Sequence, residues 1–227
     1  MATAQEKFDE AERLRTKKYA REALSLYIDV TADSSASEEL KLAAWHMGGV
    51  AWRMHGNFER SEFWLETAMQ LAVDAGAPEK KIAAIYSDLA ETARQSGDLP
   101  QAKGNIRVAL ALDGTRYPAE VGIANGFLAR IESTEGNFQP ALRHHQLANV
   151  LLRWCDDRRP WLYNSLPYAE TLSRCGHPLV ARWVATRALI ASPKLGSKEH
   201  AYKATAILVG GWRLTAFLSE RRRQSGK

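Results

Sequence analysis

The chain has 227 residues, of which 45% are hydrophobic and 25% charged. This composition is typical of a globular protein and excludes a disordered tail or a fibrous chain. The longest apolar stretch, residues 204–218, contains Arg213 and falls short of the roughly 20 residues that span a membrane, so we expect no transmembrane helix. The N-terminus lacks the apolar core of a secretory signal, and we therefore expect a cytoplasmic protein.

The formal net charge of +5 is unevenly distributed along the chain. Residues 1–112 hold 14 Lys/Arg and 17 Asp/Glu, whereas residues 113–227 hold 17 Lys/Arg and 9 Asp/Glu. The end of the chain, residues 221–227, is a basic tail that contains Arg221, Arg222 and Arg223. Such a tail can contact phosphate or an acidic protein face, or can simply be solvated.

Apolar residues at helical spacing, with turn residues between them, predict an all-α chain. Ser35 and Glu38 suggest a capping box before the third helix. Pro167 conflicts with the ninth helix: it either kinks that helix or moves its start to Ser165. The predicted helices are 4–17, 19–32, 37–55, 58–75, 79–96, 99–112, 118–135, 138–155, 160–175, 178–191 and 198–220.

A repeat appears when the chain is aligned on four turn glycines, Gly56, Gly97, Gly136 and Gly176, which stand 41, 39 and 40 residues apart. A glycine can adopt the left-handed conformation that ends a helix, and the Asn or Asp after the first three can cap the next helix. Small residues recur at fixed distances from each glycine: Ser61, Ala102, Ala141 and Ala181 five residues after it, Ala68, Ala109, Ala148 and Ala188 twelve after it, and Gly49, Ala90, Ala129 and Ala169 seven before it.

This pattern resembles the tetratricopeptide repeat (TPR) family. The strongest copy follows the family's spacing with Trp45, Gly49, Trp52, Gly56, Phe58, Ser61, Leu65 and Ala68. Its period of about 40 residues exceeds the common 34 and is similar to the long repeats of kinesin light chains and of Gram-positive peptide sensors.

The resemblance implies a right-handed α-solenoid of about five TPR-like helix pairs, over residues 1–196. The expected repeats are 4–33, 42–76, 83–113, 122–156 and 162–192. A C-terminal capping helix, 197–220, and the basic tail, 221–227, would follow. In such a fold the first helix of each pair lines a concave face. On this face the resemblance places ten partner-binding candidates: His46, Arg53, Asp88, Glu91, Arg94, Phe127, Arg130, Tyr163, Glu170 and Arg174.

No phosphate loop, nucleophile elbow or metal-ligand pattern appears, so we expect neither an enzyme nor a cofactor or metal site. Adjacent His144 and His145 point about 100° apart on a helix and make a poor metal pair. Cys155 and Cys175 are predicted to lie at opposite ends of a helix pair, too far apart for a disulfide.

The favoured hypothesis is a protein-interaction module that holds a peptide or protein segment on the concave face. One alternative is a nucleic-acid-associated adaptor that uses the basic C-terminal half. Another is a peptide-sensing regulator. Self-association as a homo-oligomer through Trp64 and Trp183 is a further alternative, because both are predicted to face outward from second helices.

Overall fold

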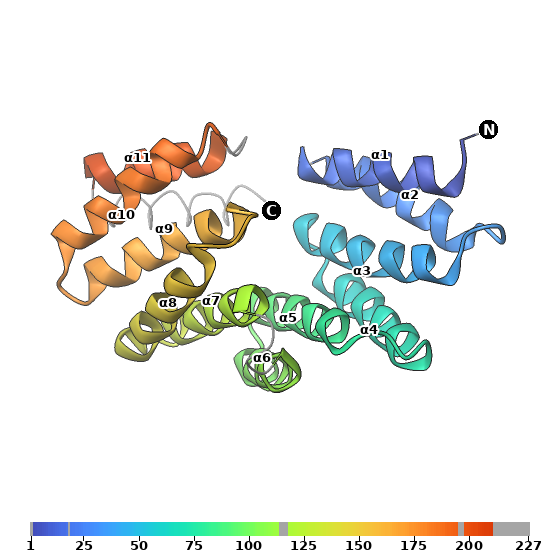
Figure 1. The fold of residues 1–227 in the computed structure, drawn as a ribbon, viewed down its shortest axis with the longest axis horizontal. Coiled ribbons are helices and arrows are strands. Elements are labelled where there is room, and N and C mark those ends of the chain that lie inside the picture. The colour runs from blue at the N-terminus through green and yellow to red at the C-terminus, as the bar shows by residue number, and fades with distance from the viewer. Residues whose placement is uncertain (1, 18, 114–117, 195–197, 211–227) are drawn as a thin grey trace. The chain divides into compact units, whose positions relative to one another are not determined.

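The computed structural model describes residues 2–17, 19–113, 118–194 and 198–210, and the elements within them are helices (Figure 1). The chain forms two compact units, Met1–Gly114 and Thr115–Lys227. Unit 1 contains α1 (Ala4–Thr16), α2 (Ala20–Ala32), α3 (Glu38–Met54), α4 (Phe58–Asp74), α5 (Glu79–Ser96) and α6 (Leu99–Asp113). Unit 2 contains α7 (Pro118–Thr134), α8 (Phe138–Leu152), α9 (Arg159–Arg174), α10 (Pro178–Ala191) and α11 (Lys198–Gly210).

The helices pair in chain order, as the repeat predicts. In unit 1, α1 packs on α2, α3 on α4 and α5 on α6; in unit 2, α7 packs on α8 and α9 on α10. The first helices of successive pairs also touch within each unit: α1 contacts α3 and α3 contacts α5, whereas α7 contacts α9 and α9 contacts α11. We call the helices α1, α3 and α5 the first-helix layer of unit 1, and α7, α9 and α11 that of unit 2.

Turn glycines lie between the first and second helices of four of the pairs. All four have φ between 83° and 100°, a backbone conformation that residues with a side chain adopt only with strain: Gly56, Gly97, Gly136 and Gly176. The side chain of Asn57 then accepts from the amide of Arg60 at 3.0 Å, and that of Asp98 accepts from the amide of Gln101 at 2.9 Å. Of the three predicted caps, Asn57 and Asp98 therefore make the expected hydrogen bonds, whereas the side chain of Asn137 makes none to its helix.

The recurring small residues let the paired helices approach closely. The alanines and the serine at the three repeated places are all buried, and almost all of them are fully buried. At Gly49 of α3, an added Cβ would lie 2.7 Å from Cγ of Leu65 on α4. Because real Cβ contacts are never this short, glycine at this place is required by helix packing, as the sequence predicts.

The structure corrects one local expectation and decides between the two alternatives for Pro167. The cap of α3 is Ser37, whose hydroxyl accepts from the amide of Leu40 at 3.2 Å, while Ser35 instead bonds to Asp33. The ninth helix begins at Arg159 and continues through Pro167, so Ser165 is not its start. The Ser165 hydroxyl donates to the carbonyl of Trp161 at 2.8 Å, which satisfies the serine within the helix.

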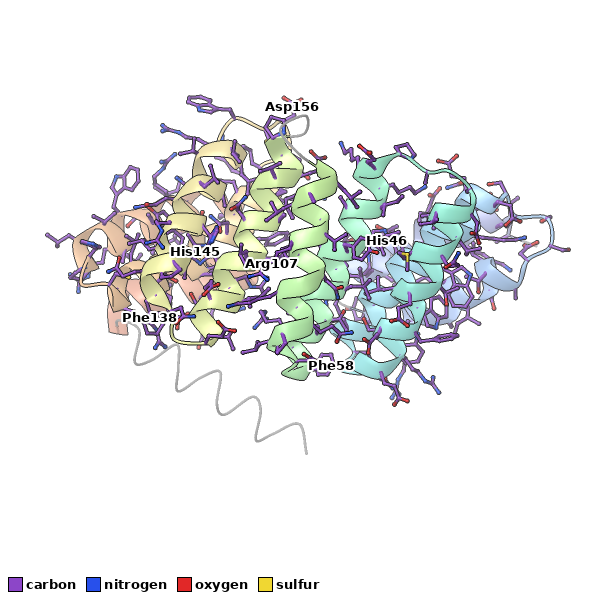
Figure 2. The ribbon with its side chains drawn as sticks, turned by 90° about the horizontal axis from the view of Figure 1, so that it is seen from below. His46, Phe58, Arg107, Phe138, His145 and Asp156 are labelled. Carbon is purple, nitrogen blue, oxygen red and sulfur yellow. The ribbon has the colours of Figure 1, made fainter. Side chains whose placement is uncertain are left out.

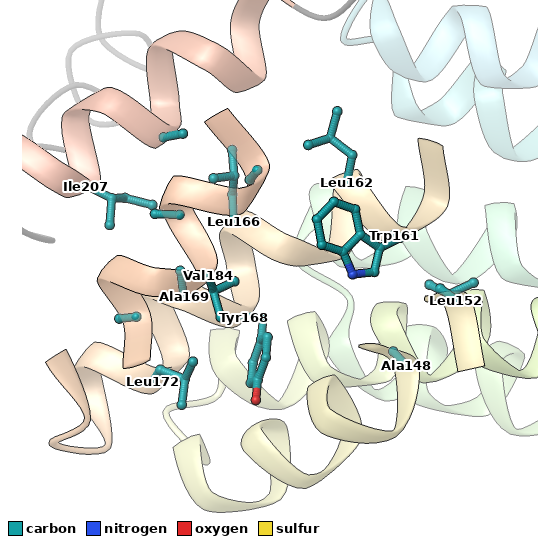
Figure 3. Close-up of a cluster of buried hydrophobic side chains, with 14 of the residues drawn as sticks. Ala148, Leu152, Trp161, Leu162, Leu166, Tyr168, Ala169, Leu172, Val184 and Ile207 are labelled. Atoms are coloured by element: carbon teal, nitrogen blue, oxygen red, sulfur yellow. The ribbon is translucent and has the colours of Figure 1, made fainter. Parts of the chain in front are cut away.

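The core of unit 2 joins α8, α9, α10 and α11 (Figure 3). Trp161, Leu162 and Leu172 of α9 lie at its centre, and Ala204 and Ile207 of α11 are buried against it. The described part of the predicted final helix therefore packs on the last helix pair. Residues 211–220 of that prediction and the basic tail, with Arg221, Arg222 and Arg223, lie outside the described residues.

Candidate functional site

Three predicted site residues meet in the first-helix layer of unit 1. Nε2 of His46 on α3 lies 2.9 Å from one carboxylate oxygen of Asp88 on α5. Arg53, two turns further along α3, donates to the other oxygen at 2.7 Å and to the Asp88 carbonyl at 2.8 Å. The structure therefore brings His46, Arg53 and Asp88 together as one cluster, which joins the second and third repeats (His46 is labelled in Figure 2).

The cluster extends toward α1 through residues that the site prediction did not include. Glu12 of α1 pairs with Arg15 at 2.6 Å and accepts from the hydroxyl of Tyr27 on α2. Burial by itself would raise the pKa of Glu12, but Arg15, Tyr27 and the nearby His46 offset this effect and lower it. A carboxylate on each neighbouring first helix therefore interacts with His46: Asp88 by direct contact and Glu12 through its charge.

The charged side chains of this cluster pair with one another. Burial alone would raise the pKa of Asp88, but the adjacent Arg53 and His46 outweigh it and hold the pKa well below its usual range. The Arg53 side chain is only 11% exposed, and its remaining contact is the Thr92 hydroxyl at 3.4 Å. His46, Arg53 and Asp88 thus connect repeats, and a ligand would meet the edge of this cluster rather than unpaired charges.

Glu91 and Arg94 form a second pair, one turn apart on α5. Nε and Nη2 of Arg94 each donate to a Glu91 oxygen at 2.9 Å, and Gln95 donates to the same carboxylate at 2.6 Å. Glu91 is only 3% exposed. Reversing the charge of Arg94 would place two carboxylates together in a buried site, so Arg94 is unsuited to probing partner binding by charge reversal.

The predicted residues of unit 2 lie on its first-helix layer in three separate groups. On α7, the guanidinium of Arg130 lies 5.6 Å from the ring centre of Phe127. On α9, Tyr163 is 54% exposed and stacks at 4.8 Å on His200 of α11. At the other end of α9, Arg174 pairs with Glu170 at 3.2 Å and lies over the ring of Phe138. These groups are spaced along the layer rather than focused on one point.

Unit 2 also contains a buried polar group that the site prediction did not include. Nδ1 of His145 on α8 lies 2.7 Å from Oδ1 of Asn164 on α9, and Nδ2 of Asn164 donates to the His145 carbonyl at 3.3 Å. The adjacent His144 reaches Asn125 on α7 at 2.9 Å. The spacing in the sequence does not predict either contact, because the separation of facing residues on antiparallel helices changes with distance from the turn: Trp161 of α9 meets Asn149 of α8 only 12 residues away. His145 is labelled in Figure 2.

Burial lowers the pKa of His145 to about 4, since the ring is completely removed from solvent. The unfolded chain binds a proton between pH 6.5 and 4 that the folded chain does not, so stability falls as the pH falls through this window. Between pH 7 and 5 we expect a loss of about 2 kcal/mol from His145. Urea unfolding at both pH values measures it.

The variant His145→Gln cannot titrate and should lose most of this pH dependence. The matched control is His177→Gln, which changes an exposed histidine. An unchanged difference between pH 7 and 5 in the His145 variant would contradict the prediction.

Within the described residues, no group of three or more His, Cys, Asp or Glu side chains is placed to hold a metal ion. No helix in the described part of the chain is long and apolar enough to cross a membrane. Cys155 and Cys175 are free thiols, as predicted.

Comparison with solved structures shows what this arrangement resembles. The Rap conjugation gene regulator of plasmid pLS20, solved with the Phr* peptide, aligns over 95% of this chain and 62% of its own, with a TM-score of 0.81 and 16% identity. RapI in its apo form aligns over 98% of this chain and 85% of its own, with a TM-score of 0.71 and 11% identity. TPR-like repeats of a putative kinesin light chain from Podosopora anserina align over 85% and 96%, with a TM-score of 0.60 and 18% identity.

No family model matches the sequence, and no curated protein matches it. At these identities the structural likeness concerns the fold, and it agrees with the helix pairs, the turn glycines and the buried small residues described above. The chain therefore has the all-α fold of the TPR-like helical-repeat proteins.

Proposed function

We propose that this protein is a non-enzymatic interaction module that binds a peptide or protein segment on its first-helix layers. The observation that carries the proposal is the way each layer is built. Side chains lock successive first helices together, through His46 and Asp88 in unit 1 and through Ser133 and Thr171, 3.1 Å apart, in unit 2. The layers nevertheless keep large apolar side chains exposed, namely Met54 at 43% and Tyr163 at 54%.

A surface of this kind suits an extended or helical segment. Its scaffold is already ordered, so binding orders few additional groups, and its exposed apolar side chains offer area to bury. The pLS20 Rap regulator, a protein of similar fold, was solved in complex with a peptide, which supports the same class of ligand here. The ten predicted site residues keep their place in this proposal: Tyr163 and Phe127 add apolar surface to that of Met54, and the other eight supply polar side chains on the same layers.

The test is a selection of peptides followed by loss of binding in defined variants. A library of random peptides of about 12 residues, long enough to span several first helices when extended, is selected against the full chain. The affinity of the recovered peptides is then measured by fluorescence anisotropy. We expect Met54→Glu or Tyr163→Glu to weaken binding at least about tenfold, because a buried unpaired charge costs more than 1.4 kcal/mol.

The matched control is Phe63→Glu, which changes an exposed aromatic residue on a second helix, α4. Circular dichroism establishes that each variant keeps its helices. If the recovered peptides bind both layer variants as tightly as the unaltered chain, the first-helix layers are not the binding surface.

A further inference from the structure

A second surface of unit 2 is apolar, although no helix in the described part of the chain covers it. On α10, Leu179, Trp183 and Ile190 are 78%, 58% and 63% exposed. They are spaced by four and seven residues, so they form one stripe along the helix, opposite the buried Ala181, Ala185 and Ala188.

The neighbouring second helix carries a matching stripe. Leu147 and Val150 of α8 are 45% and 62% exposed, on the side of α8 opposite its buried Ala141 and Ala148. Both helices pack on the same core, and Trp161 of α9 connects them: its Nε1 donates to Asn149 on α8 at 2.8 Å, while Arg187 of α10 lies over its ring at 5.4 Å. The two stripes therefore lie on helices that share one core and are connected through α9.

The side chain of Trp183 is positioned by contacts within unit 2 itself. The Arg187 guanidinium lies 4.8 Å from the Trp183 ring centre and also contacts the Trp161 ring, so it sits between the exposed and the buried tryptophan. Trp and Arg dominate the energetically important positions of protein interfaces, and a fixed side chain loses little entropy on binding. The sequence placed both Trp64 and Trp183 outward. Trp64 is in fact buried at 8%, and only Trp183 is exposed.

The charge around this surface has one sign. Neither α8 nor α10 contains an Asp or Glu, whereas Arg143, Arg182 and Arg187 stand beside the stripes. The corresponding helix of unit 1, α4, has four carboxylates and one arginine, and its exposed Phe63 lies among them. Complementarity to the unit 2 surface therefore calls for apolar side chains flanked by carboxylates.

We propose that the outer face of α8 and α10 is a docking surface for an acidic amphipathic helix of a partner protein. Apolar stripes on two helices that pack on the same α9 offer rows against which a helix can lay its own apolar face. An anionic membrane fits less well, because three arginines fall short of the four to eight clustered cations typical of lipid-binding segments. Residues 211–227 of this chain fit less well too, since they carry five basic residues and one Glu.

The experiment uses two synthetic helical probes and the full chain. Each probe has about 18 residues, enough to run the length of the stripe, with Leu along one face. The acidic probe carries Glu on its other faces, and the basic probe carries Lys at the same places. Fluorescence anisotropy should show the acidic probe binding at least about tenfold more tightly, because reversing its charges turns attraction into repulsion.

Variants of the chain locate the binding. Trp183→Ala should weaken the binding of the acidic probe at least about tenfold, the effect typical of a central interface tryptophan. Arg143→Glu combined with Arg182→Glu, both exposed, should remove the preference for the acidic probe and leave the Trp183–Arg187 contact intact. The matched control, Phe63→Ala on α4, should bind the acidic probe as the unaltered chain does.

Several results would overturn the proposal. The first is equal binding of the two probes. The second is no binding of the acidic probe at about 0.5 mM, a concentration that detects even weak complexes. The third is binding of the acidic probe that is unchanged by Trp183→Ala. Cosedimentation with vesicles of phosphatidylcholine and phosphatidylserine that depends on Trp183 would assign the surface to a membrane. Sedimentation velocity showing an oligomer that Trp183→Ala dissociates would assign it to a second copy of this chain. Met54→Glu and Tyr163→Glu should leave the binding of the acidic probe unchanged, which distinguishes this surface from the first-helix layers.

Discussion

Replacing Asp88 with alanine should lower the free energy of unfolding by about 3 kcal/mol or more. The carboxylate is the shared acceptor of His46 and Arg53, and its removal would leave the Arg53 guanidinium, only 11% exposed, without its charge partner. The expected loss comes mainly from this uncompensated cation rather than from the ion pair itself. Urea unfolding followed by circular dichroism at pH 7 measures it.

The matched control is Asp9→Ala, since Asp9 occupies the corresponding place of the first repeat but is exposed on α1. We expect it to change the free energy of unfolding by less than about 0.5 kcal/mol. The double variant Arg53→Ala with Asp88→Ala should lose less than the sum of the two single variants, because neither charge is then left alone. Strictly additive losses would mean that the pair is not coupled.

The same cluster makes acid stability depend on Asp88. Its folded pKa is held below the unfolded value of 3.8, so the unfolded chain takes up the proton first as the pH falls. The stabilisation is therefore complete above about pH 4 and is lost as the pH falls below it. This window lies below that of His145, so the two effects are separable in one pH series.

Trp161→Ala should lower the free energy of unfolding by about 3–5 kcal/mol, the cost typical of deleting a buried aromatic side chain. Trp161 is 3% exposed at the centre of the unit 2 core (Figure 3). Its ring also supports Arg158 at 5.0 Å and Arg187 at 5.4 Å, and its Nε1 holds Asn149 of α8. Urea unfolding gives the loss, and hydrogen exchange should locate the lost protection in α8, α9 and α10.

Trp154→Ala is the control for this substitution. Trp154 lies seven residues before Trp161 and is 80% exposed, so its removal should change the free energy of unfolding by less than about 0.5 kcal/mol. A loss for Trp161→Ala as small as that of the control would mean that the ring contributes little to joining α8, α9 and α10.

The helices and their pairing could be predicted from the sequence because they depend on local rules. A turn glycine with positive φ, an Asn or Asp cap and a small residue at a fixed distance each act within a few residues of chain, and each recurs with the repeat. The cap of α3 was misplaced by two residues because Ser35 and Ser37 are both competent caps, and only the chain entering from Asp33 decides between them.

The candidate site could be predicted from the sequence only in part. The repeat register placed His46, Arg53 and Asp88 on first helices, but it gave no means of knowing that they pair with one another. That pairing depends on how far one helix is rotated against the next, which side-chain volumes set across 35 to 42 residues of chain. The second helices show the opposite case: Trp64 stands eight residues after its turn glycine and Trp183 only seven, about 100° apart around a helix, so the repeat register itself separates the buried ring from the exposed one.

The helix pairs could be predicted without the structure, because helix formation and the close approach at Ala68, Ala109, Ala148 and Ala188 follow from residues near one another in the chain. The pairing of side chains between helices follows only from the folded structure. It joined His46 and Arg53 to Asp88 and placed Arg187 over the exposed ring of Trp183, since such contacts depend on what a neighbouring helix or turn places opposite each side chain.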